Sequence, residues 1–148
     1  MSSIKSDLRR ILAETIVKKH RSDYSIVFIK PSDGEKARTL LRDIQPWSSI
    51  TYAGEEISVV IPSSHWEKFK IHFTGHKEEG PYKLITFDIV LDLSIVGFLS
   101  FVSTALADAG ISIYAVSTYM KDHILVKKAD ATRAVIVLDC LIAEARRG

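Results

Sequence analysis

The stretch LDLSIVGFLSFVSTALADAGISIYAVSTYMKDHILVKK, residues 91–128, decides the fold that the sequence predicts. Its first part, residues 96–109, is apolar nearly all round and predicts a helix with one narrow polar stripe. That stripe consists of Ser100, Ser103, Thr104 and Asp108. Gly110 follows as a left-handed cap, which glycine adopts at little cost. A helix on a single sheet needs only one apolar face, so we expect a second cover, from the other half of the chain or from a partner subunit.

Strands and helices in the same order surround this stretch. The segments ISIYAVSTY and HILVKK predict two strands around a short turn at residues 120–122, and a last helix follows Asp130. Upstream, YSIVFIK predicts a strand, and two more strands flank Ala53 and Gly54 as a hairpin. Two capping boxes predict the starts of helices: Ser32 with Glu35, and Ser64 with Glu67. The order is βαββα followed by βαββα.

An internal repeat supports this duplication. TYAGEEISV from Thr51 aligns with TYMKDHILV from Thr118. Each βαββα unit is a ferredoxin-like half that lacks its fourth strand, so we expect a strand from the first half, or from a second copy, to fill the open edge. The predicted fold class is α/β (α+β): ferredoxin-like βαββαβ in two tandem units with an extra N-terminal helix, where the second unit's sheet takes its missing strand from elsewhere.

An amphipathic helix over residues 4–19 precedes the first unit. We divide the chain into this N-terminal segment, residues 1–22, a first unit, residues 23–80, and a second unit, residues 81–148. The helix is expected to dock on the domain rather than on a membrane, because Asp7 and Glu14 dilute its basic charge.

Composition fits a soluble protein of the cytoplasm. Charged residues make up 26% of the 148 residues and the net charge is +2, so no strong attraction to nucleic acid or membrane is expected. The single cysteine, Cys140, excludes an internal disulfide and fits a reducing compartment. The N-terminal stretch carries no secretory signal, and no apolar run reaches the ~20 residues of a membrane span.

Enzyme motifs do not occur in the sequence. It has no G-x-S-x-G, no Walker loop, no H-E-x-x-H and no G-x-G-x-x-G. His72 and His76 have the spacing of a helical metal pair, but Gly75 and Pro81 nearby indicate a loop with solvated histidines. We therefore expect no catalysis, no metal and no cofactor.

The head of helix 96–109 is a candidate binding site. Ser94 can cap the helix and Gly97 leaves space beside its first turn, where free N–H groups favour a carboxylate. The next strand ends in Ser117, Thr118 and Tyr119, with Asp122 beyond them. An amino acid, with one anion and one cation, would complement both groups. The alternative is that Ser94 only caps the helix and Gly97 only permits close packing.

The run DLSIVGFLSFVSTALADAGISIYAVSTYMKDHILVKKAD resembles the ACT domain, in the branch of short tandem ACT-like proteins related to cytosolic arginine sensors. SSITYAGEEISVVIP is similar to an upstream family segment. The resemblance implies an amino-acid ligand at an interface between ACT units. It carries over two sets of ligand-binding residues. The loop set is Asp92, Leu93, Ser94, Ile95 and Gly97, and the edge set is Ser117, Thr118, Tyr119 and Asp122.

Two residues depart from the family pattern. Leu93 replaces an aromatic residue, and Lys121 replaces a threonine, where it can neutralise Asp122. We expect a regulatory, non-catalytic protein that binds an amino acid and forms a homodimer, without nucleic acid or membrane as a partner. The alternative is a ligand-free module for protein–protein interaction and oligomerisation. A small enzyme that uses Tyr119, Asp122 and His123 is the weakest alternative.

Overall fold

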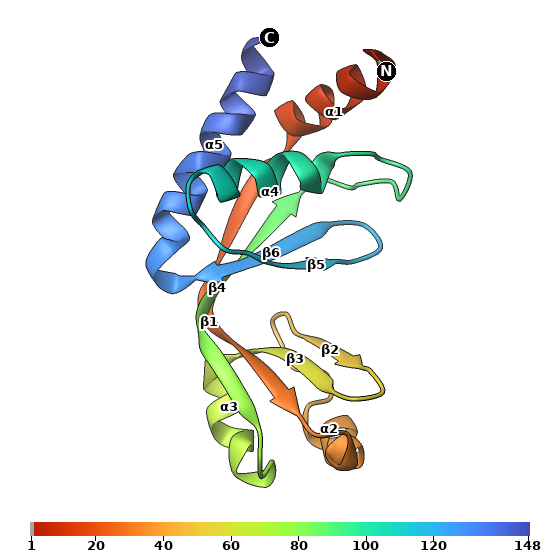
Figure 1. The fold of residues 1–148 in the computed structure, drawn as a ribbon, viewed down its shortest axis with the longest axis vertical. Helices are drawn as coiled ribbons and strands as arrows, with labels where there is room; N and C mark the ends of the chain where they lie inside the picture. Colours follow the sequence, from red (N-terminus) through yellow and green to blue (C-terminus); the bar gives the residue numbers. More distant parts are fainter. Residues whose placement is uncertain (1) are drawn as a thin grey trace. The chain divides into compact units, whose positions relative to one another are not determined.

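The computed structural model describes residues 2–148, with side chains from Ser6 onward. Figure 1 shows the fold, in which helices and strands are mixed along the chain. The elements are α1 (Ser2–Glu14), β1 (Ile16–Ile29), η1 (Pro31–Asp33), α2 (Gly34–Leu40), β2 (Ser49–Tyr52), β3 (Ile57–Pro62), α3 (Ser63–Phe69), η2 (Lys70–His72), β4 (Lys77–Asp88), α4 (Phe98–Asp108), β5 (Tyr114–Ser117), β6 (Asp122–Lys127), η3 (Lys128–Asp130) and α5 (Ala131–Arg147).

The chain forms two compact units. Unit 1 comprises Met1–His20 with Lys83–Gly148, and unit 2 comprises Arg21–Tyr82. Each of the long strands β1 and β4 contributes one end to each unit. Unit 1 is therefore built from two separate stretches of sequence, whereas unit 2 is continuous. Among residues 2–148, no helix combines the length and the apolar character that crossing a membrane requires.

Unit 2 is an antiparallel sheet with short helices. Its strands follow the order β2–β3–β1–β4, where β1 and β4 each contribute one end, and Tyr52 lies opposite Ile57 at the hairpin end. Its core contains Trp66, whose ring stacks on Phe73 with centroids 5.7 Å apart. These two rings connect α3 and the segment after it to the apolar face of the sheet.

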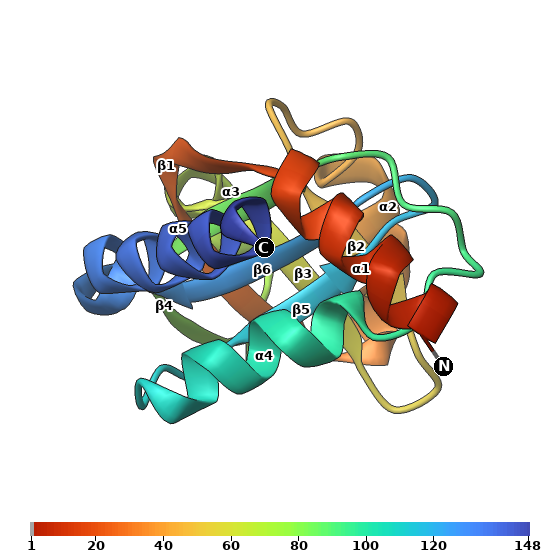
Figure 2. The same cartoon turned by 90° about the horizontal axis from the view of Figure 1, so that it is seen from above.

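Unit 1 packs three helices on its strands. The strand order is β1–β4–β6–β5, so a strand from the first half occupies the position beside β4. Helices α1, α4 and α5 lie over β4, β6 and β5 (Figure 2). Leu8 of α1, Leu106 of α4 and Leu138 of α5 belong to one buried core with Ile85 and Ile124 of the sheet. Two arginines join the outer helices: Arg9 donates to the Ala145 carbonyl at 3.3 Å and Arg146 to the Ala13 carbonyl at 2.8 Å.

Gly110 ends α4 as the sequence predicts. Its φ is +73°, its N–H donates to Ala107 O at 2.9 Å, and the N–H of Ile111 donates to Leu106 O at 2.9 Å. This is the Schellman arrangement, and the buried Ile111 and Leu106 supply the apolar side chains that usually accompany it.

The N-terminal helix is shorter than the predicted 4–19. It ends at Glu14, and β1 begins at Ile16. The Thr15 hydroxyl donates to the Ile11 carbonyl at 2.6 Å at this end. Ile16 continued the helical spacing in the sequence, but its side chain is 60% exposed. Ile16 and Val17 are β-branched and fit a strand better than a helix. This local preference outweighs the helical spacing of the apolar residues.

Neither predicted capping box forms. The helices α2 and α3 begin at Gly34 and Ser63, and no side chain caps either of them. Both are only seven residues long. A short 3₁₀ turn precedes α2, and Pro62, whose side chain cannot accept a hydrogen bond, precedes α3.

The two hairpins differ from the sequence repeat by two residues. Tyr52 pairs with Ile57 and Ser117 pairs with Asp122, so the turns are residues 53–56 and 118–121. Matching these turns places Ala53 with Thr118, whereas the sequence repeat places Thr51 there. An even shift keeps each side chain on its face of the sheet, so the apolar pattern alone does not reveal it.

Candidate functional site

The loop between β4 and α4, residues 89–97, is organised around Asp92. The Asp92 Oδ1 atom accepts the Ser94 N–H at 2.8 Å and the Ser94 hydroxyl at 2.6 Å. These hydrogen bonds lower the pKa of Asp92 because they favour its ionised form. Ser94 therefore orders the loop and does not cap α4, which corrects the capping role considered from sequence.

Gly97 is the residue before the first turn of α4. It has φ +91° and ψ 0°, in the left-handed region. A Cβ at this position would lie 3.4 Å from Leu8 Cδ2 of α1. Both a positive φ and close packing therefore favour glycine here.

The end of the β5–β6 hairpin forms the opposite side. The Ser117 hydroxyl donates to Asp122 Oδ1 at 2.6 Å, and the Thr118 hydroxyl donates to the Lys121 carbonyl at 3.0 Å. The Thr118 N–H also donates to Lys121 O at 2.9 Å and closes the turn. The turn covers residues 118–121. The sequence predicted that Asp122 lies in the turn, but it is the first residue of β6.

Lys121 pairs with Asp88 and not with its neighbour Asp122. The distance from Lys121 Nζ to Asp88 Oδ1 is 2.6 Å. The hydrogen bond from Lys121, and then its charge, lower the pKa of Asp88. The expectation that Lys121 neutralises Asp122 is thus not met, because β4 presents a closer carboxylate.

A cavity of about 310 Å³ lies between this loop, the head of α4 and the hairpin end. Most of the predicted site residues line it: Asp92, Leu93, Ile95, Gly97, Ser117, Thr118 and Asp122. Ser94 is not among the lining residues, and neither is Tyr119, whose side chain is 80% exposed. The structure therefore brings together the loop and the strand end that the sequence proposed as partners.

The cavity also has lining residues that were not predicted. They are Leu91, Phe98, Leu99, Ser100 and Lys121. Phe98 is buried and its ring meets Phe87 edge to face at 5.5 Å, which fixes the first turn of α4 on β4. Ser100 is the first residue of the polar stripe noted in the sequence. That stripe could have identified Ser100 as a residue that lines the cavity.

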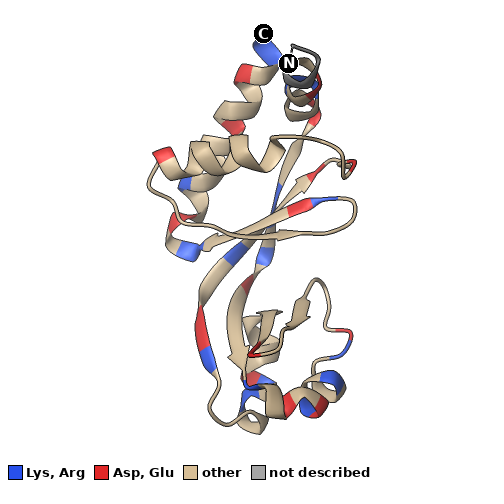
Figure 3. Cartoon of the chain, turned by 45° about the vertical axis from the view of Figure 1, so that its right-hand side comes forward, with Lys and Arg blue, Asp and Glu red and all other residues tan. Residues whose placement is uncertain are grey.

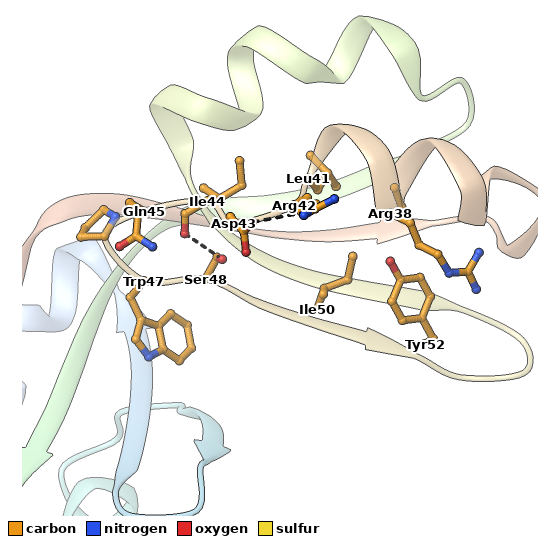
Figure 4. A pocket seen from close by; sticks show the side chains of 12 residues that line it. Arg38, Leu41, Arg42, Asp43, Ile44, Gln45, Trp47, Ser48, Ile50 and Tyr52 are labelled. Carbon is orange, nitrogen blue, oxygen red and sulfur yellow. Dashed lines mark hydrogen bonds and ion pairs between the residues drawn. The ribbon is translucent and has the colours of Figure 1, made fainter.

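Unit 2 has a larger cavity, of about 530 Å³, between α2, residues 41–48 and β2. Figure 4 shows its polar side chains engaged with one another. The Arg38 guanidinium lies 4.7 Å from the centre of the Tyr52 ring, and Arg42 Nε lies 3.3 Å from Asp43 Oδ2. None of the predicted site residues lines it, so we take the cavity in unit 1 as the candidate site.

His72 and His76 belong to unit 2. Residues 2–148 hold no group of three or more His, Cys, Asp or Glu side chains placed to bind a metal. His72 is exposed, but His76 is not the solvated side chain that was expected. Its Nδ1 lies 2.8 Å from the Phe73 carbonyl, and its ring packs edge to face on Trp66 with centroids 5.1 Å apart.

Basic and acidic residues are interspersed in both units (Figure 3). The fold and the site together define a mixed α/β protein with antiparallel strands, helices packed against them, and a cavity at the head of one helix. Residues 78–140 match the family model of the ACT domain. This match runs from β4 into α5, so it contains the candidate site.

Solved structures share the fold. A Vibrio cholerae protein of unknown function, described as a possible transport protein, has 20% identity and a TM-score of 0.73 over 94% of this chain and 98% of its own. An Agrobacterium tumefaciens protein has 23% identity and a TM-score of 0.70 over 89% of each chain. The regulatory subunit of aspartate kinase from Thermus flavus has 12% identity and a TM-score of 0.62, over 83% and 94%. Curated protein sequences give no match.

Proposed function

We propose that this chain is a non-catalytic regulatory protein that binds a small molecule, an amino acid, in the cavity of unit 1. One observation carries the proposal: the cavity of about 310 Å³ lies between the N-terminus of α4 and the end of the β5–β6 hairpin, where Asp122 supplies a carboxylate. Small-molecule sites occupy ~300–1,000 Å³, so the cavity suits a compact ligand. The ACT-domain match over the same residues supports a regulatory role.

The hairpin side of the cavity suits a ligand ammonium group. Ser117 and Thr118 line the cavity and each donates its hydroxyl proton within the protein. A hydroxyl has one proton, so these side chains offer the ligand oxygen acceptors. Together with the carboxylate of Asp122, they favour a positively charged donor.

The opposite side suits a carboxylate. Gly97, Phe98, Leu99 and Ser100 line the cavity, and they include the first residues of α4. N–H groups in the first turn have no partner within the helix, and the helix dipole favours negative charge there. An amino acid can place its carboxylate at α4 and its ammonium group at Asp122.

A cationic ligand side chain fits this arrangement too. Because Lys121 is paired with Asp88, the charge of Asp122 is available to the ligand. The proposed relation to cytosolic arginine sensors therefore predicts that arginine is among the ligands to test.

A thermal-shift screen of the full chain with the twenty amino acids tests the proposal. A ligand at 100 times its Kd stabilises the folded state by about 2.7 kcal/mol, which is readily measured as a rise in Tm. Asp122→Ala and Ser94→Ala should each reduce the shift, Asp122 by direct contact and Ser94 through Asp92. If none of the twenty raises Tm at millimolar concentration, the proposal fails.

A ligand-free interaction module is the second candidate. The observation in its favour is an exposed apolar group at the head of α4: Leu93 is 73%, Val96 61% and Phe101 50% exposed. We propose that these side chains meet a second copy in a homodimer, so that the cavity lies at an interface between ACT units. Sedimentation of the wild type against Leu93→Ser with Phe101→Ser tests this: the double variant should be more monomeric, and equal dimer fractions would exclude this surface.

A further inference from the structure

A chain of hydrogen bonds runs from the candidate site across unit 1. His20 Nε2 of β1 lies 2.8 Å from Thr86 Oγ1 of β4, and the same oxygen lies 2.9 Å from His123 Nδ1 of β6. His123 Nε2 lies 3.2 Å from Thr118 Oγ1, which donates to the Lys121 carbonyl at 3.0 Å. Thr118 lines the cavity. The chain thus connects the cavity to a histidine two strands away.

The donors in this chain can be assigned from chemistry. Thr118 gives its one proton to the Lys121 carbonyl, so it can only accept from His123, which must carry its proton on Nε2. In a neutral imidazole the other nitrogen, Nδ1, then accepts from the Thr86 hydroxyl. Thr86 in turn accepts from His20, which carries its proton on Nε2. With the Thr118 hydroxyl donating to Lys121, this arrangement gives each hydrogen bond of the chain one donor and one acceptor.

This arrangement limits how many protons the histidines can bind. If His123 gains a proton on Nδ1, the Thr86 oxygen must accept it, and the Thr86 hydroxyl must turn to His20. His20 then has to carry its proton on Nδ1 and stay neutral. If both imidazoles were charged, Thr86 would accept from both and its own hydroxyl proton would lose its acceptor. The intact chain therefore holds one extra proton at most.

The surroundings also disfavour two charges. Burial, and then the charge of Lys18 on β1, lower the pKa of His20. Burial, and then the nearby His20, lower the pKa of His123. The other charged groups near the pair, taken strand by strand, are Asp88 on β4, Lys121 in the hairpin turn and Asp122 on β6. Asp122 is the nearby group that favours the protonated form of His123, and Lys121 opposes it.

We propose that His20, Thr86 and His123 form a relay that positions the Thr118 hydroxyl at the cavity and accepts a single proton, so that ligand binding is linked to the protonation of the histidine pair. His123 and Thr86 are positioning residues in this relay. The link to the ligand rests on the proposed function, whereas the relay itself does not.

Nitrogen-15 NMR of the imidazoles in the full-length chain tests the relay without a ligand. At neutral pH, both His20 and His123 should be neutral with the proton on Nε2. On acidification the pair should take up its protons in two separated steps. A proton on Nδ1 of either residue at neutral pH, or two independent titrations, would overturn the relay.

The variant Thr86→Val removes the shared hydroxyl with little change of volume. It should bring the two titration steps of the histidine pair closer together, leaving only the separation that the charge repulsion between the imidazoles causes, and Thr132→Val on the exposed face of α5 should leave the steps unchanged. An unchanged separation in the Thr86→Val protein would overturn the relay. If this variant does not fold, the wild-type tautomers still decide the matter.

The ligand link uses the amino acid that gives the largest Tm shift in the screen. Its ammonium group is placed beside Asp122, so a proton on His123 should repel it. Because the pKa of His123 is lowered from the ordinary imidazole value, the affinity should fall below that value, between about pH 6.5 and about pH 4.5. Loss of the Thr118 positioning in Thr86→Val should weaken binding about two- to tenfold at the higher pH. Equal affinity in both proteins at both pH values would refute the link while leaving the proposed function intact. If no amino acid binds, the proposed function fails, the link falls with it, and the NMR result stands alone.

Discussion

The two units contain the same kind of hairpin but enter their first helix differently. In unit 2, Lys30 alone separates β1 from the short turn η1, which continues into α2. In unit 1, the loop of residues 89–97 separates β4 from α4. The hairpin turns, residues 53–56 and 118–121, are equal in length.

This difference shows what makes the candidate site. The cavity of unit 1 lies where its loop faces the hairpin end, and Asp92 together with Gly97 gives that loop its shape. Unit 2 has a comparable hairpin, but its direct connection supplies no such loop. Both units therefore contain a hairpin of this kind, and the loop of residues 89–97 distinguishes the candidate site.

Removing core volume from α4 should have the largest effect. Leu106 is fully buried in the core of unit 1, so Leu106→Ala should lower the free energy of unfolding by about 2–5 kcal/mol. Phe101→Ala, on the same helix but half exposed, is the control and should cost clearly less. Denaturant unfolding measures both. Hydrogen exchange should accelerate in unit 1 first, and equal acceleration in unit 2 would show that the two cores do not behave separately.

Changing one carboxylate in each hairpin should sharpen the contrast at the site. Asp122→Asn removes a charged acceptor from the cavity and should raise the Kd of the stabilising amino acid roughly 10- to 100-fold. Glu56→Gln, at the end of the unit 2 hairpin turn, should leave Kd unchanged. Calorimetric titration of both variants checks this. An effect of Glu56→Gln as large as that of Asp122→Asn would place the ligand elsewhere.

A glycine in each unit tests the role of the loop in stability. Gly97→Ala forces alanine to adopt φ +91° close to Leu8, so it should cost about 1–2 kcal/mol. Gly54→Ala in the unit 2 hairpin meets open space and should be nearly neutral. Thermal unfolding of the two variants gives the comparison. A neutral Gly97→Ala would mean that the loop relaxes without consequence.

The ion pair beside the cavity should have the smallest effect. Lys121→Met removes the partner that lowers the pKa of Asp88, so this pKa should rise towards its ordinary value. A lowered folded-state pKa contributes stability above the unfolded-state pKa and loses it as the pH falls through the folded-state pKa. The variant should therefore differ from the wild type in neutral solution and converge with it in strong acid. Carbon-13 NMR of the carboxylate measures the shift, with Lys127→Met as the control.

Much of the fold follows from local signals in the sequence. Gly110 predicts its own Schellman cap because glycine adopts a positive φ cheaply, and the order of strands and helices follows from hydrophobic periodicity. The predicted end of the N-terminal helix was wrong because Ile16 fits both a helical and a strand pattern. The two predicted capping boxes do not form. A serine three residues before a glutamate is compatible with such a box, but it does not determine the backbone conformation that the box requires.

The candidate site was only partly accessible from the sequence. Gly97 and Asp122 could be proposed because a helix head and a strand end are expected to face each other, and Asp92 could be proposed from the resemblance to the ACT domain. The partner of Lys121 could not be predicted, because Asp88 lies on β4 and is 33 residues away in the sequence. The relay was hidden for the same reason: His20 and Thr86 are joined to His123 only through the register of the sheet.

The discontinuity of unit 1 has a consequence for the order of folding. Unit 2 is one stretch, Arg21–Tyr82, and can complete its native contacts as soon as that stretch is available. Leu8 and Leu138 share the core of unit 1, so α1 must wait for α5, and the loop closed between them spans nearly the whole chain. During synthesis, the apolar face of α1 therefore lacks its α5 partner until α5 has been made, whereas unit 2 can already be complete.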